Sequence, residues 1–243
     1  MSINRIPVLK RLVPSVRKRV VPLLWPRGWR VTELHGALFL VNYFSFTDRV
    51  IGFDRRWERQ QIEYLCKGIA RYGAEVFFDI GAYGGLYAIL VAQEKLCERI
   101  VAFEPDPNCR QRLYANLHLN NMTDRIEVRE EALSDRSGRL PFFRETTFGG
   151  GKSRIVPTSD FSVPCARLDD LFDFRAKNIA LKIDVEYHEI EVLSGMKSLL
   201  QNNACFFQIE CPDDHLPSAM EQLGPLGYRL MHSIGHDRYF TNH

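Results

Sequence analysis

The sequence predicts an α/β protein with a doubly wound, mainly parallel sheet, an antiparallel hairpin at its C-terminal end and an accessory segment at its N-terminal end. Three observations predict this fold. From residue 74 onward, short apolar or β-branched runs alternate with segments of helical periodicity. One strand runs into a glycine-bearing turn and then into a helix. The 243 residues are 45% apolar and 26% charged, which is enough hydrophobic mass for one large core.

Five short apolar runs are the expected strands of the parallel sheet, at residues 75–80, 99–103, 125–130, 179–185 and 204–211. The segments between them are the expected helices, at residues 86–94, 107–120, 186–200 and 216–223. Two further strands are expected at residues 140–143 and 161–166, on either side of a polar loop at 144–159. Residues 228–231 and 238–241, around a turn at Gly235, form the expected C-terminal hairpin.

The N-terminal part of the chain differs in composition from the rest. The first 32 residues hold eight Arg or Lys and no acidic residue, although the net charge of the whole chain is only +2. Apolar residues recur at spacings of three and four, interrupted by Pro14 and Pro22. Residues 1–30 therefore suit a peripheral contact with an anionic membrane surface or with a polyanionic substrate; alternatively, they pack on the domain and keep their charges in water.

Residues 31–53 are expected to form one or two β-hairpins, and residues 57–72 a helix. We divide the chain accordingly into a basic amphipathic arm with a hairpin element, residues 1–56, and a main domain, residues 57–243.

Several classes of protein are disfavoured. The longest uncharged apolar stretch, residues 36–46, is too short to span a membrane, and the N-terminus does not have the pattern of a secretory signal. The six cysteines form no CxxC pair, which indicates a reducing, cytoplasmic environment and argues against structural zinc, so no metal site is expected. A pI of about 8.2 without an RNA-binding motif argues against a nucleic-acid partner. We expect a cytoplasmic protein, with peripheral contact at the inner face of the membrane as the alternative.

The segment VFFDIGAYGGLYA, residues 76–88, carries the first chemical signal. A buried strand containing Asp79 leads into a turn with Gly81, Gly84 and Gly85 and then into a helix. Glycines let the backbone approach a ligand closely, and the helix N-terminus offers free N–H groups. The motif alone also suits a dinucleotide-binding unit or a purely structural turn.

Acidic residues end two neighbouring strands. Glu104, in IVAFEPDP, lies about 20 residues beyond the glycine turn, where a carboxylate accepts hydrogen bonds from the hydroxyls of an adenosine ribose. Asp184 and Glu186, in LKIDVEYHEIEVLSGM, reach the carboxyl edge of the sheet, where α/β proteins bind ligands. Asp79 precedes the glycines, where dinucleotide sites need no acid but S-adenosylmethionine (SAM) sites commonly have one.

These motifs together, with NLHLNN and the late FFQIE, resemble the FkbM family of SAM-dependent methyltransferases over residues 57–211. The resemblance implies a class I methyltransferase fold, which is Rossmann-like, and SAM as cofactor. It implies that Asp79, Gly81 and Gly85 hold the amino-acid end of SAM, that Glu104 binds the ribose, and that Glu131 and Ala132 lie beside adenine. Asp184 would lie near the reactive methyl group. Tyr83 and Pro105 belong to the same cofactor-binding motifs.

The resemblance also implies O-methylation of a hydroxyl, on a sugar of a glycan, glycolipid or secondary metabolite. His188 is the first candidate for the base that removes the hydroxyl proton, because imidazole titrates near neutrality. Asp184 and Glu186 are the alternatives, and alignment of acceptor and methyl group without any special base is a third possibility. The chain departs from the family pattern at Tyr187, where glycine is usual, and at Tyr83, where asparagine is common.

The glycine-rich loop at residues 144–154, with Lys152 and Arg154, suits a cationic lid over the acceptor, or an ordinary mobile loop. Two other functions stay open from the sequence: a nicotinamide-dependent oxidoreductase, and a SAM-binding scaffold protein without catalysis. The sequence predicts neither the acceptor's identity nor the oligomeric state.

Overall fold

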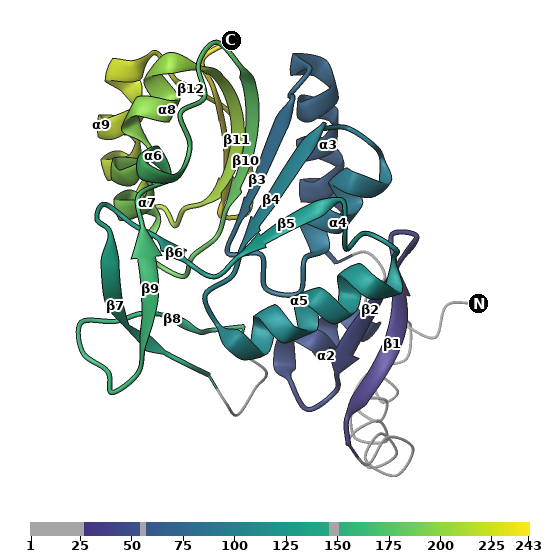
Figure 1. Cartoon of the computed structure of the whole chain (residues 1–243). Helices are drawn as coiled ribbons and strands as arrows, with labels where there is room; N and C mark the ends of the chain where they lie inside the picture. Colours follow the sequence, from purple (N-terminus) through teal and green to yellow (C-terminus); the bar gives the residue numbers. More distant parts are fainter. Residues whose placement is uncertain (1–26, 54–56, 146–150) are drawn as a thin grey trace, which may run out of the picture.

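The protein is described here by a computed structural model covering residues 27–53, 57–145 and 151–243 (Figure 1). Most of the predicted basic arm, residues 1–26, lies outside the described residues, as do residues 146–150 of the predicted lid loop. Among the described residues, no helix is both long and apolar enough to cross a membrane.

A seven-stranded sheet forms the centre of the molecule, in the order β12-β13-β11-β10-β3-β4-β5. Five strands run parallel: β3 (Val76–Ile80), β4 (Arg99–Phe103), β5 (Ile126–Arg129), β10 (Asn178–Ile183) and β11 (Ala204–Glu210). β12 (Arg229–Ile234) and β13 (Asp237–Thr241) form the predicted antiparallel hairpin, and β13 pairs with β11. The predicted doubly wound sheet is therefore confirmed, with strand ends that differ by at most three residues.

Alternating side chains of the central strands pack into two separate hydrophobic layers. In β3, Phe77 belongs to one layer, whereas Val76, Phe78 and Ile80 belong to the other, as the period of two in a strand requires. One face is covered by α3 (Arg59–Tyr72), α4 (Leu86–Gln93) and α5 (Pro107–Leu119). The other is covered by α6 (Leu168–Leu171), α7 (Glu189–Gly195), α8 (Lys197–Asn202) and α9 (Leu216–Leu223), followed by the short 3₁₀ helix η2 (Gly224–Leu226) (Figure 1).

A smaller four-stranded sheet lies beside the main one, in the order β6-β9-β7-β8. It contains β6 (Ala132–Leu133), β7 (Gly138–Phe143), β8 (Arg154–Ile155) and β9 (Ser162–Ala166). The strands expected at 140–143 and 161–166 are β7 and β9. The two-residue strands β6 and β8 were not predicted, because so short a pairing leaves no periodic pattern.

Residues 29–53 contain one hairpin rather than two. β1 (Trp29–Leu34) pairs with β2 (Ala37–Asn42), and residues 46–53 form helix α2 (Phe46–Phe53) where a strand was possible. Ser45 explains the helix start, because its hydroxyl accepts a hydrogen bond from the Asp48 N–H at 3.2 Å. The acidic side chain of Asp48 in the first turn also favours a helix N-terminus.

The helix predicted at residues 186–200 is shorter and divided. Glu186 and Tyr187 have φ angles of 55° and 75°, so the chain turns in the left-handed region before α7 begins at residue 189. Met196, with φ −125° and ψ 22°, separates α7 from α8. Periodicity did not reveal either interruption, because the apolar side chains on both sides of Met196 still face the same core.

Candidate functional site

The turn between β3 and α4 brings two strand ends into close contact. Asp79 is 1% exposed, and its Oδ2 accepts a hydrogen bond from the Ala88 N–H at 3.0 Å. Burial raises the pKa of Asp79 to about 6, although Lys182 acts in the opposite direction. Gly81 has φ 81°, and a Cβ there would lie 1.8 Å from the backbone oxygen of Asp184. The turn can therefore approach the end of β10 only with glycine at this position.

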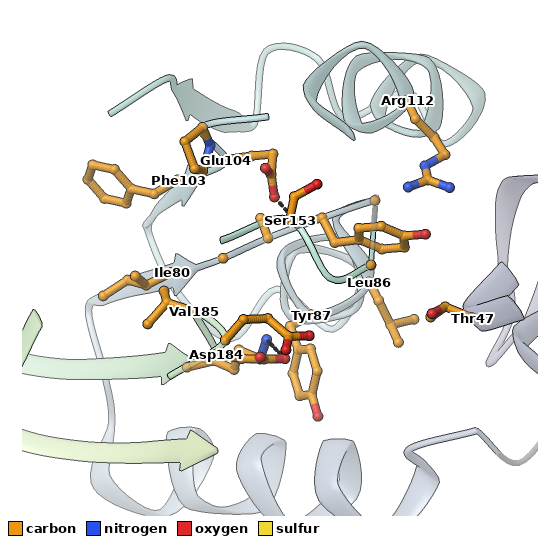
Figure 2. A pocket seen from close by; sticks show the side chains of 18 of the residues that line it. Thr47, Ile80, Leu86, Tyr87, Phe103, Glu104, Arg112, Ser153, Asp184 and Val185 are labelled. Atoms are coloured by element: carbon orange, nitrogen blue, oxygen red, sulfur yellow. Dashed lines mark hydrogen bonds and ion pairs between the residues drawn. The ribbon is translucent and has the colours of Figure 1, made fainter. Parts of the chain in front are cut away.

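Glu104 follows β4 and is held from both sides by backbone. Its Oε2 accepts the Tyr83 N–H at 2.7 Å, and its Oε1 accepts the Asp106 N–H at 2.8 Å. Burial raises the pKa of this carboxyl to about 8, although the two backbone hydrogen bonds favour the charged form. The side chain is only 6% exposed, yet it lines a cavity, and Figure 2 shows its carboxyl group directed into that cavity.

The cavity has a volume of about 400 Å³ and lies at the carboxyl ends of β3, β4 and β10. β2, α2 and residues 151–155 form its other walls. Figure 2 shows Ile80, Phe103 and Val185 on the sheet side and Thr47 on the side of the N-terminal helix. The volume falls in the range of ordinary small-molecule sites.

One end of the cavity carries a buried ion pair. Lys182 Nζ lies 2.9 Å from Asp184 Oδ2 and 5.1 Å from the centre of the Tyr87 ring. Burial disfavours both charges, but each charge favours the other, so the pKa of Asp184 is lowered and that of Lys182 is raised. Repulsion from Asp184, together with burial, raises the pKa of Glu210 to about 9. At neutral pH, Asp184 is therefore ionised and Glu210 holds its proton.

Most of the predicted site residues line the cavity, and the others lie in the structure around it. Eight of them line the cavity: Gly81, Tyr83, Glu104, Pro105, Glu131, Ala132, Asp184 and Glu186. Asp79 and Gly85 do not line it. Gly85 has φ 82° and begins α4, and a Cβ at Gly85 would lie 2.3 Å from Leu113 Cδ1 of α5.

Glu186 reaches the cavity from the turn after β10. Burial, with the charges of Asp184 and Glu189, raises its pKa to about 7, and the nearby Arg154 and Lys152 oppose the rise. Residues 151–155, the described part of the predicted lid loop, border the cavity on this side.

His188 does not line the cavity. Its Nε2 lies 2.9 Å from Ser134 Oγ, and its Nδ1 lies 3.5 Å from Glu191 Oε2. The chain changes direction at the left-handed turn formed by Glu186 and Tyr187, before residue 188. The imidazole of His188 therefore packs against the loop after β6. Burial lowers its pKa. The geometry does not favour His188 as the catalytic base, and that role stays a prediction.

A second set of residues at the site comes from the N-terminal region and was not predicted from the sequence. Asp48 of α2 is 1% exposed, and its Oδ2 accepts hydrogen bonds from Arg112 Nη1 at 2.5 Å and from the Asn42 N–H at 2.8 Å. Its Oδ1 accepts the Tyr83 hydroxyl at 2.9 Å, and the Arg112 guanidinium stacks over the Tyr83 ring at 4.0 Å. Tyr83, which departs from the family pattern, thus connects α2 to the glycine turn.

Asn116, in the NLHLNN motif of α5, makes a similar connection. Its Oδ1 accepts the Leu40 N–H at 2.7 Å, and its Nδ2 donates to the Gly84 oxygen at 2.7 Å. The side chain therefore joins β2 to the glycine turn. The motif was visible in the sequence, but its partners lie up to 76 residues away along the chain.

The chain belongs to the family defined by the methyltransferase FkbM domain, which it matches over residues 79–230. It is 27% identical over 151 residues to the hexuronic acid methyltransferase AglP of Haloferax volcanii, covering 61% of this chain and 60% of that protein. It is 30% identical over 169 residues to the methyltransferase sdnD of Sordaria araneosa, covering 54% of this chain and 64% of that protein. The matches thus span less than two thirds of either relative.

A solved structure shows the same fold. The crystal structure of methyltransferase FkbM from Methylobacillus flagellatus KT superposes with a TM-score of 0.52 at 19% sequence identity, covering 70% of this chain and 44% of that one. Fold and family imply a methyl donor of the SAM type.

The residues present fit such a donor. The buried Glu104 carboxyl, whose two oxygens are held by backbone N–H groups, offers its remaining lone pairs to the cavity and suits two ribose hydroxyls. Pro105, Glu131 and Ala132 line the same end of the cavity, where an adenine ring would lie. The ionised Asp184 at the other end suits the positive charge of a sulfonium.

Proposed function

We propose that this protein is a SAM-dependent methyltransferase that methylates a hydroxyl oxygen on a sugar of a glycan, glycolipid or secondary metabolite. The observation that carries the proposal is the Glu104 carboxyl, which faces a cavity of about 400 Å³ at the carboxyl edge of the sheet. Membership of the FkbM family supports methyl transfer, and the name of the Haloferax volcanii relative supports a sugar acid as one acceptor to test.

The chain's own residues account for binding and orientation. Glu104 would hold the ribose, and Gly81 lets the backbone of the turn approach the ligand. Bound SAM supplies an electrophilic methyl group on a positively charged sulfur. Asp184 places a negative charge near that end, and Lys182 keeps Asp184 ionised. Tyr83 and Asp48 hold the N-terminal helix against the cavity, which keeps water away from the reacting groups.

Two basic side chains that line the cavity affect which acceptor it can bind. Lys152 and Arg154 line the cavity beside Glu186. Their positive charges favour an acceptor that carries an anionic group as well as a hydroxyl.

No group of three or more His, Cys, Asp or Glu side chains within residues 27–53, 57–145 and 151–243 is arranged to hold a metal ion.

Calorimetric titration with SAM and S-adenosylhomocysteine tests the cofactor. We expect saturable binding of both to the purified chain, and at least a 30-fold loss of affinity in Glu104→Ala, because the ribose hydroxyls lose their acceptor. Absence of binding to the folded protein would contradict the proposal. Transfer of radiolabelled methyl from SAM into glycan and glycolipid fractions, and into methyl glucoside and methyl glucuronoside, then identifies the acceptor.

A further inference from the structure

A second hollow opens from the main cavity on the side of β11 and β13. It has a volume of about 250 Å³, and six of the residues lining it also line the main cavity: Trp57, Glu58, Tyr87, Lys182, Asp184 and Glu210. The turn between β12 and β13, with His236 and Asp237, closes its far side. Glu104, at the end of β4, is at the opposite end of the main cavity, beyond β10 and β3 in the order of the sheet. If the adenosine of SAM lies at the Glu104 end and its methyl group near Asp184, an acceptor that reaches the methyl group from the other side would occupy this hollow.

Glu58, which is not part of the sheet, lines both the main cavity and the second hollow. It immediately precedes α3, and its carbonyl accepts the Ile62 N–H at 2.9 Å. Its φ of 51° and ψ of 19° are left-handed, a conformation that non-glycine residues rarely adopt. The side chain makes no capping hydrogen bond to its own helix, which leaves the carboxyl group available to the cavities. The strained backbone instead directs the carboxyl group to the boundary between the two hollows.

The other acidic groups of this boundary already have strong partners. Asp184 is paired with Lys182, and interaction with Asp184 favours the protonated form of Glu210. Asp237 accepts the Gln208 Nε2–H at 2.7 Å. The Tyr87 hydroxyl favours the charged form of Glu58 and accepts a hydrogen bond from Gln208 Nε2 at 3.0 Å.

We propose that Glu58 is the general base of methyl transfer, and that the acceptor hydroxyl binds at the boundary of the two hollows within its reach. This inference rests on the proposed function. The hydroxyl proton passes to the Glu58 carboxylate, the hydroxyl oxygen forms a bond to the methyl carbon, and the carbon–sulfur bond breaks with its electron pair staying on sulfur. The Tyr87 hydroxyl orients the carboxylate, and Trp57 offers an apolar face on which a sugar ring packs.

The charges around Glu58 suit this role. On the sheet side it faces Lys182 of β10, Asp184 just after β10, and Glu210 of β11. It also faces Tyr87 of α4, and His236 and Asp237 of the β12–β13 hairpin. Burial raises the pKa of Glu58 to about 7, the nearby acids add to the rise, and Lys182 limits it. A base that titrates near the working pH is both available and effective. Asp184, kept ionised by Lys182, is a weaker base, and Glu210 holds its proton.

The test compares Glu58→Gln with Glu63→Gln in the full chain. Glu63 lies on the same helix, is exposed and pairs with Arg59 at 2.7 Å, so its variant controls for the loss of one carboxylate. We expect Glu58→Gln to lower kcat at least 100-fold on the acceptor found by radiolabelling, with SAM affinity within threefold of the unmodified chain. Glu58→Asp should recover part of the rate, and Glu63→Gln should keep the full rate.

A second measurement does not depend on turnover. Carboxyl ¹³C NMR of the ligand-free chain should show two resonances that titrate near pH 7, from Glu58 and Glu186. One of the two should be absent from Glu58→Gln, and both should be present in Glu63→Gln. Turnover by Glu58→Gln within threefold of the unmodified chain would overturn the base role alone. Loss of SAM affinity in this variant would also overturn it, because Glu58 would then serve the methyl donor. Failure of the unmodified chain to methylate any acceptor would refute the proposed function, and the role of Glu58 with it.

Discussion

The ionisation of Glu104 couples cofactor binding to pH. Burial raises the pKa of the ligand-free carboxyl to about 8, so most molecules carry it protonated at pH 7. Ribose hydroxyls donate hydrogen bonds to the carboxylate, which favours the ionised form and lowers the pKa on binding. Binding below pH 8 therefore releases a proton, and affinity increases as the pH rises toward 8.

We expect the affinity for S-adenosylhomocysteine to rise by up to about tenfold per pH unit between pH 6 and 8, and to level off above pH 8. Calorimetry in two buffers with different ionisation enthalpies measures the proton released. Glu104→Gln, which does not titrate, should bind weakly and show a flatter profile. A pH-independent affinity in the unmodified chain would mean that the carboxyl does not contact the ligand.

Among the secondary-structure elements, α2 is attached to the glycine turn and to α5 through one side chain, Asp48. Asp48 is a buried carboxylate that faces the Arg112 guanidinium and the Tyr83 hydroxyl. Removing one partner of a buried ion pair destabilises a protein by about 3–5 kcal/mol, because the other charge stays buried. Removing the hydroxyl of Tyr83 costs about 1 kcal/mol, the typical contribution of one hydrogen bond.

Urea unfolding should therefore show a free energy of unfolding lowered by about 3–5 kcal/mol in Asp48→Ala and by about 1 kcal/mol in Tyr83→Phe. The exposed Glu63→Ala, which breaks a surface pair with Arg59, should leave the free energy of unfolding nearly unchanged. Equal effects of Asp48→Ala and Glu63→Ala would show that α2 is not anchored through this ion pair.

These elements also show what could be predicted from the sequence. The strand–turn–helix containing Asp79 and Gly81, and the acid after β4, were predictable because each depends on a short segment of chain. Asp48 was not, because Tyr83 and Arg112, which it contacts, lie 35 and 64 residues away. His188 would face the cavity in a helix that begins at residue 186, but the left-handed turn at Glu186 and Tyr187 delays the helix to residue 189.

At the scale of the whole molecule, a testable question is whether the domain boundary predicted at residue 56 separates two independent units. Leu34, Phe39 and Val41 of the N-terminal hairpin are at most 4% exposed and belong to the same hydrophobic cluster as Phe77 of β3. Burying each such side chain contributes about 1.5–3 kcal/mol, and whole domains are stable by only about 5–15 kcal/mol. The hairpin also provides part of the cavity wall.

A chain beginning at residue 27 keeps the whole hairpin and is the reference in which only residues 1–26 are missing. A chain beginning at residue 57 should melt far lower, or not cooperatively, and should lose SAM binding, because it exposes one side of the core and opens the cavity. Circular dichroism melting with calorimetry compares the three chains. Equal stability and affinity of the chain from residue 57 would instead establish residues 57–243 as an autonomous domain, with the hairpin as an accessory to it.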